Sequence, residues 1–305
     1  MLAYLEPEEP SGDECISLEE ACESFLCSRR DMGCTPETIR MYEETVGAFV
    51  EVRKDKPIDE VSLSGVRKWV HDESLATATR KKRYSKIRAF LRHHSEASLS
   101  KDVPVPRVQE KLPVACRPEE LEAICGEIRA ACTRMRRSGV VSARQLIWRI
   151  PVYQFAFLTG LRHSELSRLR WEDVEETRLV LRKQKSGRQQ RLPLSVKAQD
   201  LLCRLGKSEG YVFRSPSGPS GSRTRSWGAR LTRTFAKYRD KAGVRKEVTV
   251  RSLRARYITQ LAKAGLNAVA IKRLARHSDI KTSLRYIEAA GESFRDELDE
   301  AFHTH

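Results

Sequence analysis

Long apolar segments are missing from this sequence. No run of about 18 consecutive apolar residues, the minimum for a membrane-spanning helix, occurs in it. The first ten residues carry Glu6, Glu8 and Glu9, whereas a secretory signal would begin with positive charge and continue with an apolar stretch. We therefore expect a soluble cytoplasmic protein with no membrane partner.

Cysteines are few, and their number and spacing are typical of neither a disulfide scaffold nor a zinc site. Eight in 305 residues are too sparse for a disulfide scaffold. Four stand at positions 15, 22, 27 and 34, without the close Cys-x-x-Cys pairs that zinc sites favour. Cys22 shares a predicted helix face with Phe25, where a thiol acts as a small apolar residue. Core packing is favoured over the zinc alternative, and we expect no metal and no cofactor.

Positive charge is what the chain has in excess, and it is unevenly distributed. Lys and Arg number 57 against 41 Asp and Glu, a formal net charge of +16. Residues 1–50 sum to −9, whereas residues 101–305 sum to +20. A basic body points to a polyanionic partner, nucleic acid first, although charge alone does not separate DNA from RNA, a ribosome or an anionic membrane. The length predicts two domains.

The first hundred residues predict an acidic flexible tail over 1–14 and a small all-helical domain over 15–100. Ser17 and Glu20 have the spacing of a capping box, and Pro36 stands at the first position of a second helix. Apolar residues recur at helical spacing after both starts. Two further helices are predicted over residues 62–70 and 77–94.

The last of these helices is dense in cations. Seven lysines and arginines and no acid occur between Arg80 and Arg92. A solvated face is the plain alternative, but charge of one sign at this density favours a helix that contacts nucleic-acid phosphates. The residues expected to bind there are Arg80, Lys81, Lys82, Arg83, Lys86 and Arg88.

The rest of the chain predicts a linker and a second domain. Residues 101–113 hold three prolines among few apolar residues, which is typical of an extended linker. Residues 114–290 combine helical spacing with two short strands around a Lys-Ser-Gly turn, so the expected fold is mainly α with a small antiparallel sheet. Residues 291–305 form a last amphipathic segment. The expected elements are helices at 117–132, 142–158, 225–242, 252–264, 268–275 and 280–286, strands at 178–182 and 190–194, and a loop at 215–222.

The stretch Thr159-Gly-Leu-Arg-His-Ser-Glu contains the first residues that carry chemistry. Gly160 is placed to end a buried helix. Arg162 follows at the next helix start, where backbone amides already favour an anion. Glu165 lies three residues on, on the same helical face. Taken alone, Arg162 and Glu165 would be an ordinary surface ion pair.

Two later stretches add cations, an imidazole and a phenol. Arg251 and Arg254 share one face of a helix start, where two like charges repel unless an anion binds. His277 and Tyr286 stand nine positions apart. Singly, each of these residues would be assigned to the core or the surface.

In this order and spacing, the set resembles the tyrosine recombinase (phage integrase) family over about residues 109–290. Several ordered motifs in one chain make chance agreement improbable, although each one alone would be weak. The N-terminal helical domain is similar to the family's core-binding domain, which closes the other side of a DNA clamp. The matching motifs are Thr159-Gly-Leu-Arg with Trp171-Glu-Asp, Lys185-Ser-Gly before Leu192-Pro-Leu, Arg251-Ser-Leu-Arg254, and His277-Ser with Tyr286.

The resemblance implies a covalent reaction on DNA. Tyr286 would attack a phosphodiester and form a 3′-phosphotyrosine, releasing a 5′-hydroxyl. Arg162 and Arg254 would clamp the nonbridging oxygens, because a planar guanidinium can bond them bidentately. Arg251 would add a further phosphate contact. Fixed cations do this work, so no metal is implied.

The remaining roles also come from the resemblance. Lys185 would protonate the leaving 5′-oxygen, and Lys183 is its rival because a hairpin can slip by two residues. His277 would hydrogen bond the phosphate, and Glu165 would orient the neighbouring basic groups. Independently of the resemblance, Arg188 beside the hairpin turn is expected to contact DNA phosphates or solvent.

The sequence departs from the family at three positions. Arg251 stands where the family has His, and an arginine cannot shuttle protons near neutral pH. Ala255 replaces a second His, and Arg276 replaces the glycine before His277. Two aromatic residues are expected in the core: Tyr257, rather than acting as a second nucleophile, and Trp171, rather than stacking on bases.

The resemblance thus implies a site-specific recombinase or integrase that clamps double-stranded DNA and works as a tetramer on two duplexes, at the nucleoid if the source is prokaryotic. Residues 291–305 would dock onto a neighbouring protomer. Two alternatives stay open: a catalytically weak or inactive DNA-binding protein on the same fold, in which Arg251 marks decay, and a topoisomerase that relaxes DNA by the same chemistry.

Overall fold

The computed structural model describes residues 16–53, 57–94, 103–108, 114–138, 146–182, 189–214 and 224–290. The chain divides into two compact units, residues 1–110 and residues 111–305. No helix within these ranges is long and apolar enough to cross a membrane. The acidic tail, the loop at 215–222 and the segment 291–305 lie outside the described residues.

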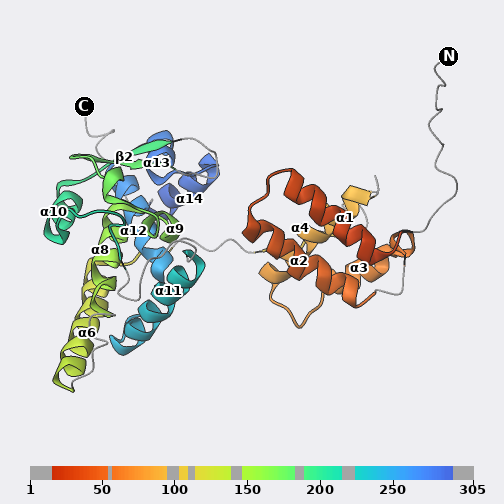
Figure 1. Ribbon diagram of the computed structural model, residues 1–305, viewed down its shortest axis with the longest axis horizontal. Helices are drawn as coiled ribbons and strands as arrows, with labels where there is room; N and C mark the ends of the chain where they lie inside the picture. The colour runs from red at the N-terminus through yellow and green to blue at the C-terminus, as the bar shows by residue number, and fades with distance from the viewer. Residues whose placement is uncertain are drawn as a thin grey trace, which may run out of the picture. The chain divides into compact units, whose positions relative to one another are not determined.

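The first unit is a group of helices around one apolar core, as predicted (Figure 1). Ser17 accepts from the amide of Glu20 while the Glu20 carboxylate accepts from the amide of Ser17 at 3.0 Å, which confirms the capping box. Phe25 meets Phe90 edge-on in the core, with ring centroids 5.6 Å apart. Cys22 is buried beside them. The elements are α1 (Leu18–Asp31), α2 (Pro36–Glu51), η1 (Ile58–Glu60), α3 (Leu63–Val70) and α4 (Thr77–His94).

Part of the proline-rich segment packs onto this unit. Val103 is fully buried in the core of the first unit. The imidazole Nε2 of His71 lies 2.8 Å from the carbonyl oxygen of Pro104. The predicted linker over residues 101–113 therefore differs from the structure at its start, because one valine among the prolines has an apolar pocket to fill.

The second unit is mostly helical with one small sheet, the fold class expected from the sequence (Figure 1). Its elements are α6 (Pro118–Arg137), α8 (Arg149–Thr159), α9 (His163–Leu166), η2 (Trp171–Asp173), β1 (Arg178–Leu181), β2 (Gln190–Pro193), α10 (Val196–Leu205), α11 (Thr224–Lys241), α12 (Val250–Lys263), α13 (Ala268–Ala275) and α14 (Ile280–Ala290).

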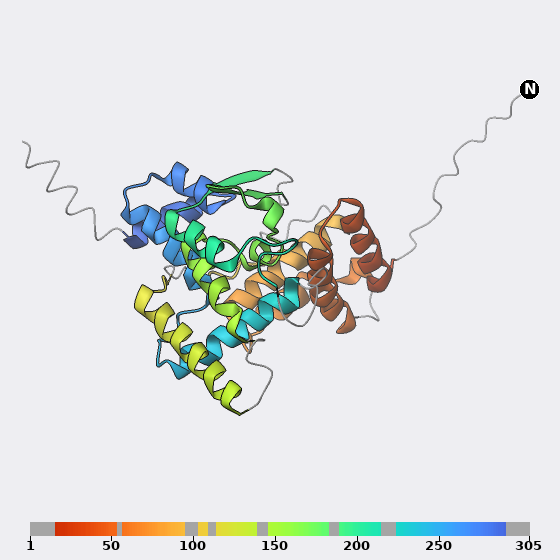
Figure 2. The same cartoon turned by 60° about the vertical axis from the view of Figure 1, so that its left-hand side comes forward.

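Helix α8 lies at the centre of this unit. It packs against α6, α10 and α12, while α11 runs beside α6 (Figure 2). The buried hydroxyl of Tyr153 on α8 donates to the carbonyl of Leu231 on α11 at 2.8 Å. The helix predicted over 142–158 is interrupted: residues 146–147 are helical, Trp148 forms a turn, and α8 runs on from Arg149, while residues 139–145 are outside the described ranges.

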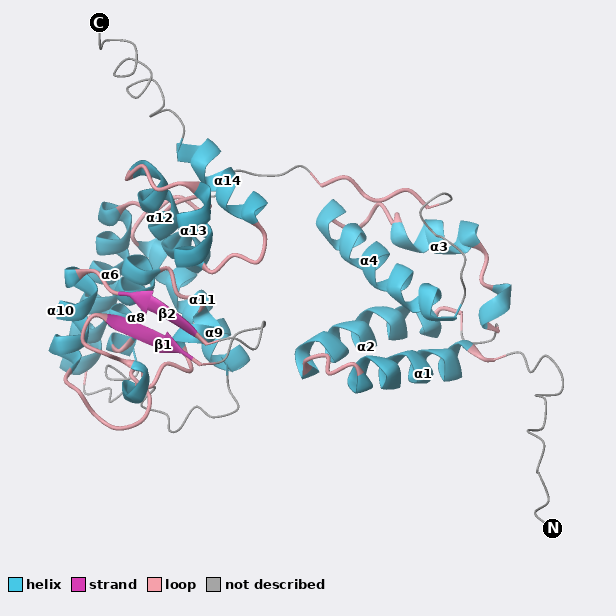
Figure 3. Ribbon diagram, turned by 90° about the horizontal axis from the view of Figure 1, so that it is seen from above, coloured by secondary structure: helices cyan, strands magenta, loops and turns pink. Residues whose placement is uncertain are grey.

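Among the described residues, the sheet is an antiparallel pair, β1 with β2 (Figure 3). Leu179 faces Leu192 in its register, and both side chains are buried. Trp171 is buried in the same core, as predicted. Helix α10 was not predicted, although Ala198, Leu201 and Leu202 follow helical spacing and are buried.

Candidate active site

The site is built around a left-handed turn at Gly160. Gly160 ends α8 with φ +61° and ψ +19°, and its amide donates to Ala156 at 2.9 Å. A Cβ at this position would clash with Cδ1 of Tyr257. Glycine is therefore required twice, for its backbone angles and for the close approach of an aromatic ring. Tyr257 packs here and against Ile258, which fits the predicted core role.

Glu165 is a buried carboxylate that holds Arg162. One carboxylate oxygen accepts from the Arg162 amide at 2.8 Å and the other from its guanidinium at 2.9 Å. The Glu165 side chain is 8% exposed and that of Arg162 is 40% exposed. Arg276 and Arg162 together lower the pKa of Glu165, although burial opposes them. The carboxylate therefore stays charged, and the outer part of Arg162 faces solvent.

Arg254 reaches the same turn from α12. One of its terminal nitrogens donates to the Gly160 carbonyl and the other to the Ala275 carbonyl. Burial, with Arg162 and Arg276 close by, lowers the pKa of Arg254 to about 9. A guanidinium crowded by two others is stabilised when an anion binds, because the anion offsets the repulsion.

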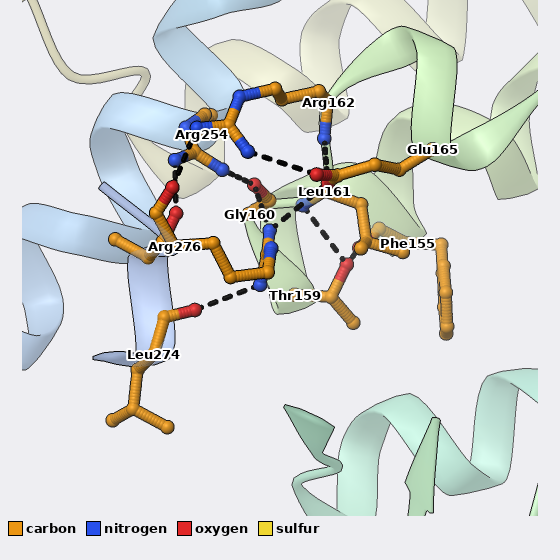
Figure 4. Close-up of polar contacts among 10 residues, drawn as sticks. Phe155, Thr159, Gly160, Leu161, Arg162, Glu165, Arg254, Leu274 and Arg276 are labelled. Atoms are coloured by element: carbon orange, nitrogen blue, oxygen red, sulfur yellow. Dashed lines mark hydrogen bonds and ion pairs between the residues drawn. The ribbon is translucent and has the colours of Figure 1, made fainter. Parts of the chain in front are cut away.

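Arg276 completes this group, which we call the arginine cluster: Arg162, Arg254 and Arg276 around Glu165. The Arg276 guanidinium donates to the carbonyls of Leu274 and Gly160 and contacts Glu165 at 3.2 Å (Figure 4). The sequence marked Arg276 only as extra charge in place of a glycine.

His277 and Tyr286 stack beside the cluster. Their ring centroids are 6.0 Å apart with planes at 20°. The Nδ1 of His277 lies 2.9 Å from the hydroxyl of the fully buried Ser283 on α14, which fixes the imidazole against the helix that carries Tyr286.

Burial and charge set the protonation states of these two rings. Burial, Arg254, Arg162 and Arg276 lower the pKa of His277 to about 4, so its ring is neutral at pH 7. Burial raises the pKa of Tyr286 above its ordinary value of 10, although Arg254 is among the charges that oppose the rise. The phenol is therefore protonated at neutral pH.

Arg251 lies one turn before Arg254 near the start of α12 and is exposed. It adds to the lowering of the pKa of His163 on α9, which burial causes first. The predicted helix at 252–264 begins two residues earlier, at Val250, because Thr249 and Ser252 form a capping box. Arg251 is thus held on a helix at the solvent-facing edge of the site.

The other predicted lysines and arginines of the hairpin lie outside the described residues. Lys185, its rival Lys183 and Arg188 all fall between β1 and β2, in the range 183–188. Their roles stay predictions.

The cations of α4 fall into two groups. Three are held by their own unit: Arg80 donates to the Leu75 carbonyl at 2.9 Å, Arg83 to the Trp69 carbonyl at 3.0 Å, and Lys86 to the Thr45 hydroxyl at 3.0 Å. The exposed cations are Lys81, Lys82, Arg88 and Arg92.

Sequence reasoning missed two features of the site. Ser283 precedes Tyr286 by three residues, and this spacing on one helix face could have pointed to it. The carbonyl of Gly160 accepts from both Arg254 and Arg276, and no sequence pattern announces a backbone acceptor. Within the described ranges, no group of three or more His, Cys, Asp or Glu side chains is placed to hold a metal ion.

Comparison with known proteins gives a consistent result. Residues 116–292 match the family model described as the phage integrase family. The chain is 22% identical over 274 residues to a tyrosine recombinase of Pseudothermotoga lettingae, covering 81% of this chain and 88% of the relative. It is 25% identical over 310 residues to tyrosine recombinase XerC of Myxococcus xanthus, covering 93% and 98%.

The fold is also similar to a solved structure, a lambda integrase tetramer bound to a Holliday junction. The TM-score is 0.68 at 16% identity, and the match covers 90% of this chain and 78% of that chain. At this identity the likeness concerns the fold alone.

Proposed function

The chain belongs to the phage integrase family, and on that premise we propose that it cuts and rejoins double-stranded DNA through a 3′-phosphotyrosine on Tyr286. In this reaction the phenolic oxygen of Tyr286 forms a bond to the scissile phosphorus as the bond to the 5′-oxygen breaks. Attack by the released 5′-hydroxyl of another strand reverses the step and frees the tyrosine. The phosphotyrosine conserves the bond energy, so no nucleotide cofactor is needed.

One observation carries the proposal: the arginine cluster and the stacked pair of His277 and Tyr286 converge from segments far apart in the chain. In the proposed reaction, Arg162 and Arg254 hold nonbridging phosphate oxygens and stabilise the charge that grows on them. His277, with Nδ1 held by Ser283, presents Nε2 for a hydrogen bond to the phosphate.

The resting protonation states show which protons must move during cleavage. Tyr286 is protonated at rest because burial raises its pKa, so the phenol must pass its proton to a water molecule as its oxygen attacks the phosphorus. We assign protonation of the leaving 5′-oxygen to Lys185, on the resemblance of the hairpin motif.

The decisive experiment is capture of the covalent intermediate. The full chain is incubated with duplex DNA that carries its own flanking sequence and a nick just 3′ to the scissile phosphate, so that the released fragment diffuses away. A denaturing gel should show the protein joined to the 3′ phosphate end of the cut strand, and Tyr286→Phe should abolish this adduct. Tyr257→Phe is the matched control and should retain the adduct.

The other outcomes separate the rival functions. Tight binding without an adduct from the unmodified chain would overturn the enzymatic proposal in favour of a DNA-binding protein. Relaxation of any supercoiled plasmid, without exchange between two sites, would favour a topoisomerase.

We further propose that residues 15–100 and the catalytic unit hold the duplex from two sides, and that four protomers act on two duplexes. The tetrameric relative on a Holliday junction and the exposed cations of α4 support this. The protein would then act in the cytoplasm, at the nucleoid if the source is prokaryotic. Deleting residues 291–305 should weaken pairing of two DNA sites if that segment docks onto a neighbour, and unchanged pairing would contradict it.

A further inference from the structure

Arg276 is an unusual residue for its position. It caps the end of α13 in the left-handed region, with φ +59° and ψ +47°, and is the one non-glycine residue with positive φ among those described. Its side chain is 2% exposed. Both the backbone conformation and the burial of a cation cost free energy, so the contacts of this arginine must offset both.

Arg276 shares an acceptor with each partner arginine. The Glu165 carboxylate accepts from Arg162 and contacts Arg276 at 3.2 Å. The Gly160 carbonyl accepts from Arg254 and from Arg276 at 3.1 Å. The backbone carbonyl of Arg276 in turn accepts from Arg162 at 2.8 Å. Arg276 is thus bonded, directly or through one acceptor, to both arginines assigned to the phosphate (Figure 4).

These contacts join two separate pieces of the fold. Gly160 and Glu165 belong to the turn after α8 and to α9, whereas Arg276 and His277 follow α13. Both terminal nitrogens of the guanidinium donate to acceptors within the protein, one to the Leu274 carbonyl and the other to the Gly160 carbonyl and Glu165, while Nε has no partner. A side chain so enclosed does not reach the DNA, and its influence must pass through its neighbours.

We propose that Arg276 is a positioning residue for the cleavage reaction: it locks Arg162 and Arg254 in one arrangement by bridging Glu165 and the Gly160 carbonyl. This inference rests on the proposed function of the cluster. A glycine at this position would satisfy the backbone but would leave Glu165 to Arg162 alone. Arg254 would then keep the Gly160 carbonyl without the second donor that fixes that turn.

The test is a single-turnover cleavage assay on the nicked duplex, run beside DNA-binding titrations. Arg276→Gly relieves the left-handed strain while removing the bridge. We expect its rate of adduct formation to fall by roughly 10- to 100-fold, the penalty typical of slightly misplaced reacting groups, with DNA affinity within about threefold of the unmodified chain. Arg276→Lys restores the charge with one point of donation, so its rate should lie between the two.

The control is Arg273→Ala, which removes an exposed cation from the same helix and should leave the cleavage step unchanged once DNA is saturating. Equal cleavage rates for the unmodified chain and Arg276→Gly would overturn the proposal, and Arg276 would then serve only to cap the end of α13. If Arg276→Gly does not fold, wild-type cleavage by Arg276→Lys would overturn it equally. Absence of an adduct from the unmodified chain would instead refute the proposed function.

Discussion

Helix α4 and the arginine cluster use positive charge in opposite ways. On α4, cations such as Lys81 and Lys82 are exposed, and their number is visible in the sequence. In the cluster, Arg276 and Glu165 are buried, and the guanidiniums donate to backbone carbonyls far away in the chain.

The difference in exposure links the α4 cations to DNA affinity and the arginine cluster to the cleavage rate. Exposed charges attract a polyanion from any direction and are screened by salt. Buried charges are fixed in direction, and a low local dielectric strengthens their action on a reacting group. We therefore expect α4 to govern how tightly DNA is held and the cluster to govern how fast it is cut.

The largest effect should come from Arg254. Arg254→Ala removes one of the two guanidiniums that we propose hold the phosphate, and loss of one such donor costs about 100- to 1,000-fold in rate. Single-turnover formation of the adduct should fall by that factor, while DNA affinity at low salt should change little. A fall in affinity that matches the fall in rate would contradict the separation.

A glycine comparison tests rigidity next. Gly160→Ala places a methyl group against the ring of Tyr257 in a left-handed turn, so strain and overpacking together should lower the free energy of unfolding by about 3 kcal/mol. Gly33→Ala, in the first unit, has the same sign of φ with open space around it, so only the strain of about 1 kcal/mol applies. Urea melts of the full chain measure both, and equal losses would show that the Tyr257 contact can relax.

Local chemistry made much of the fold predictable. Capping at Ser17 and the spacing of α4 and α13 follow from residues within one or two turns of each other, and the predicted bounds match the structure there. Helix α10 was overlooked although its spacing was present. The start of α8 could not be placed, because apolar residues continue on both sides of Arg149.

The site was predictable as a set of residues but not as a network. The order and spacing of the motifs predicted Arg162, Arg254, His277 and Tyr286 as site residues, because both can be read directly from the sequence. The bond between Arg276 and Gly160 spans 116 residues, and only the folded chain brings them together. On α4 the number of cations was visible in the sequence, but the hydrogen bond from Arg83 to the Trp69 carbonyl was not.

The exposed cations of α4 give the third prediction. Replacing Lys81, Lys82 and Arg88 with Ala should lower DNA affinity about tenfold near 0.1 M salt, and the slope of log K against log salt should shrink by roughly 0.9 for each phosphate that the protein no longer neutralises. The cleavage rate at saturating DNA should stay the same. Fluorescence anisotropy over a salt series measures the slope.

Arg83→Ala is the matched control on the same helix. Arg83 lies over the Trp69 ring at 4.2 Å and donates to the Trp69 carbonyl, so its loss should reduce stability and leave the salt slope unchanged. A slope change equal to that of an exposed lysine would assign Arg83 to the DNA contact after all.

The smallest effect contrasts one histidine from each region. The folded pKa of His277, about 4, lies below its ordinary value of 6.5, so between these values the unfolded chain binds the proton that the folded chain refuses. The contribution of His277 to the free energy of unfolding is therefore fully present above about pH 6.5 and is lost as the pH falls toward 4. Because the ring is only half-buried, we expect a loss of about 1 kcal/mol rather than the full linkage value. His277→Gln should remove this dependence in urea melts at several pH values. His93→Gln on α4 should change it less, because burial, His94 and Arg29 lower the pKa of His93 without three arginines beside it. Equal changes would show that the cluster's charges do not act on His277.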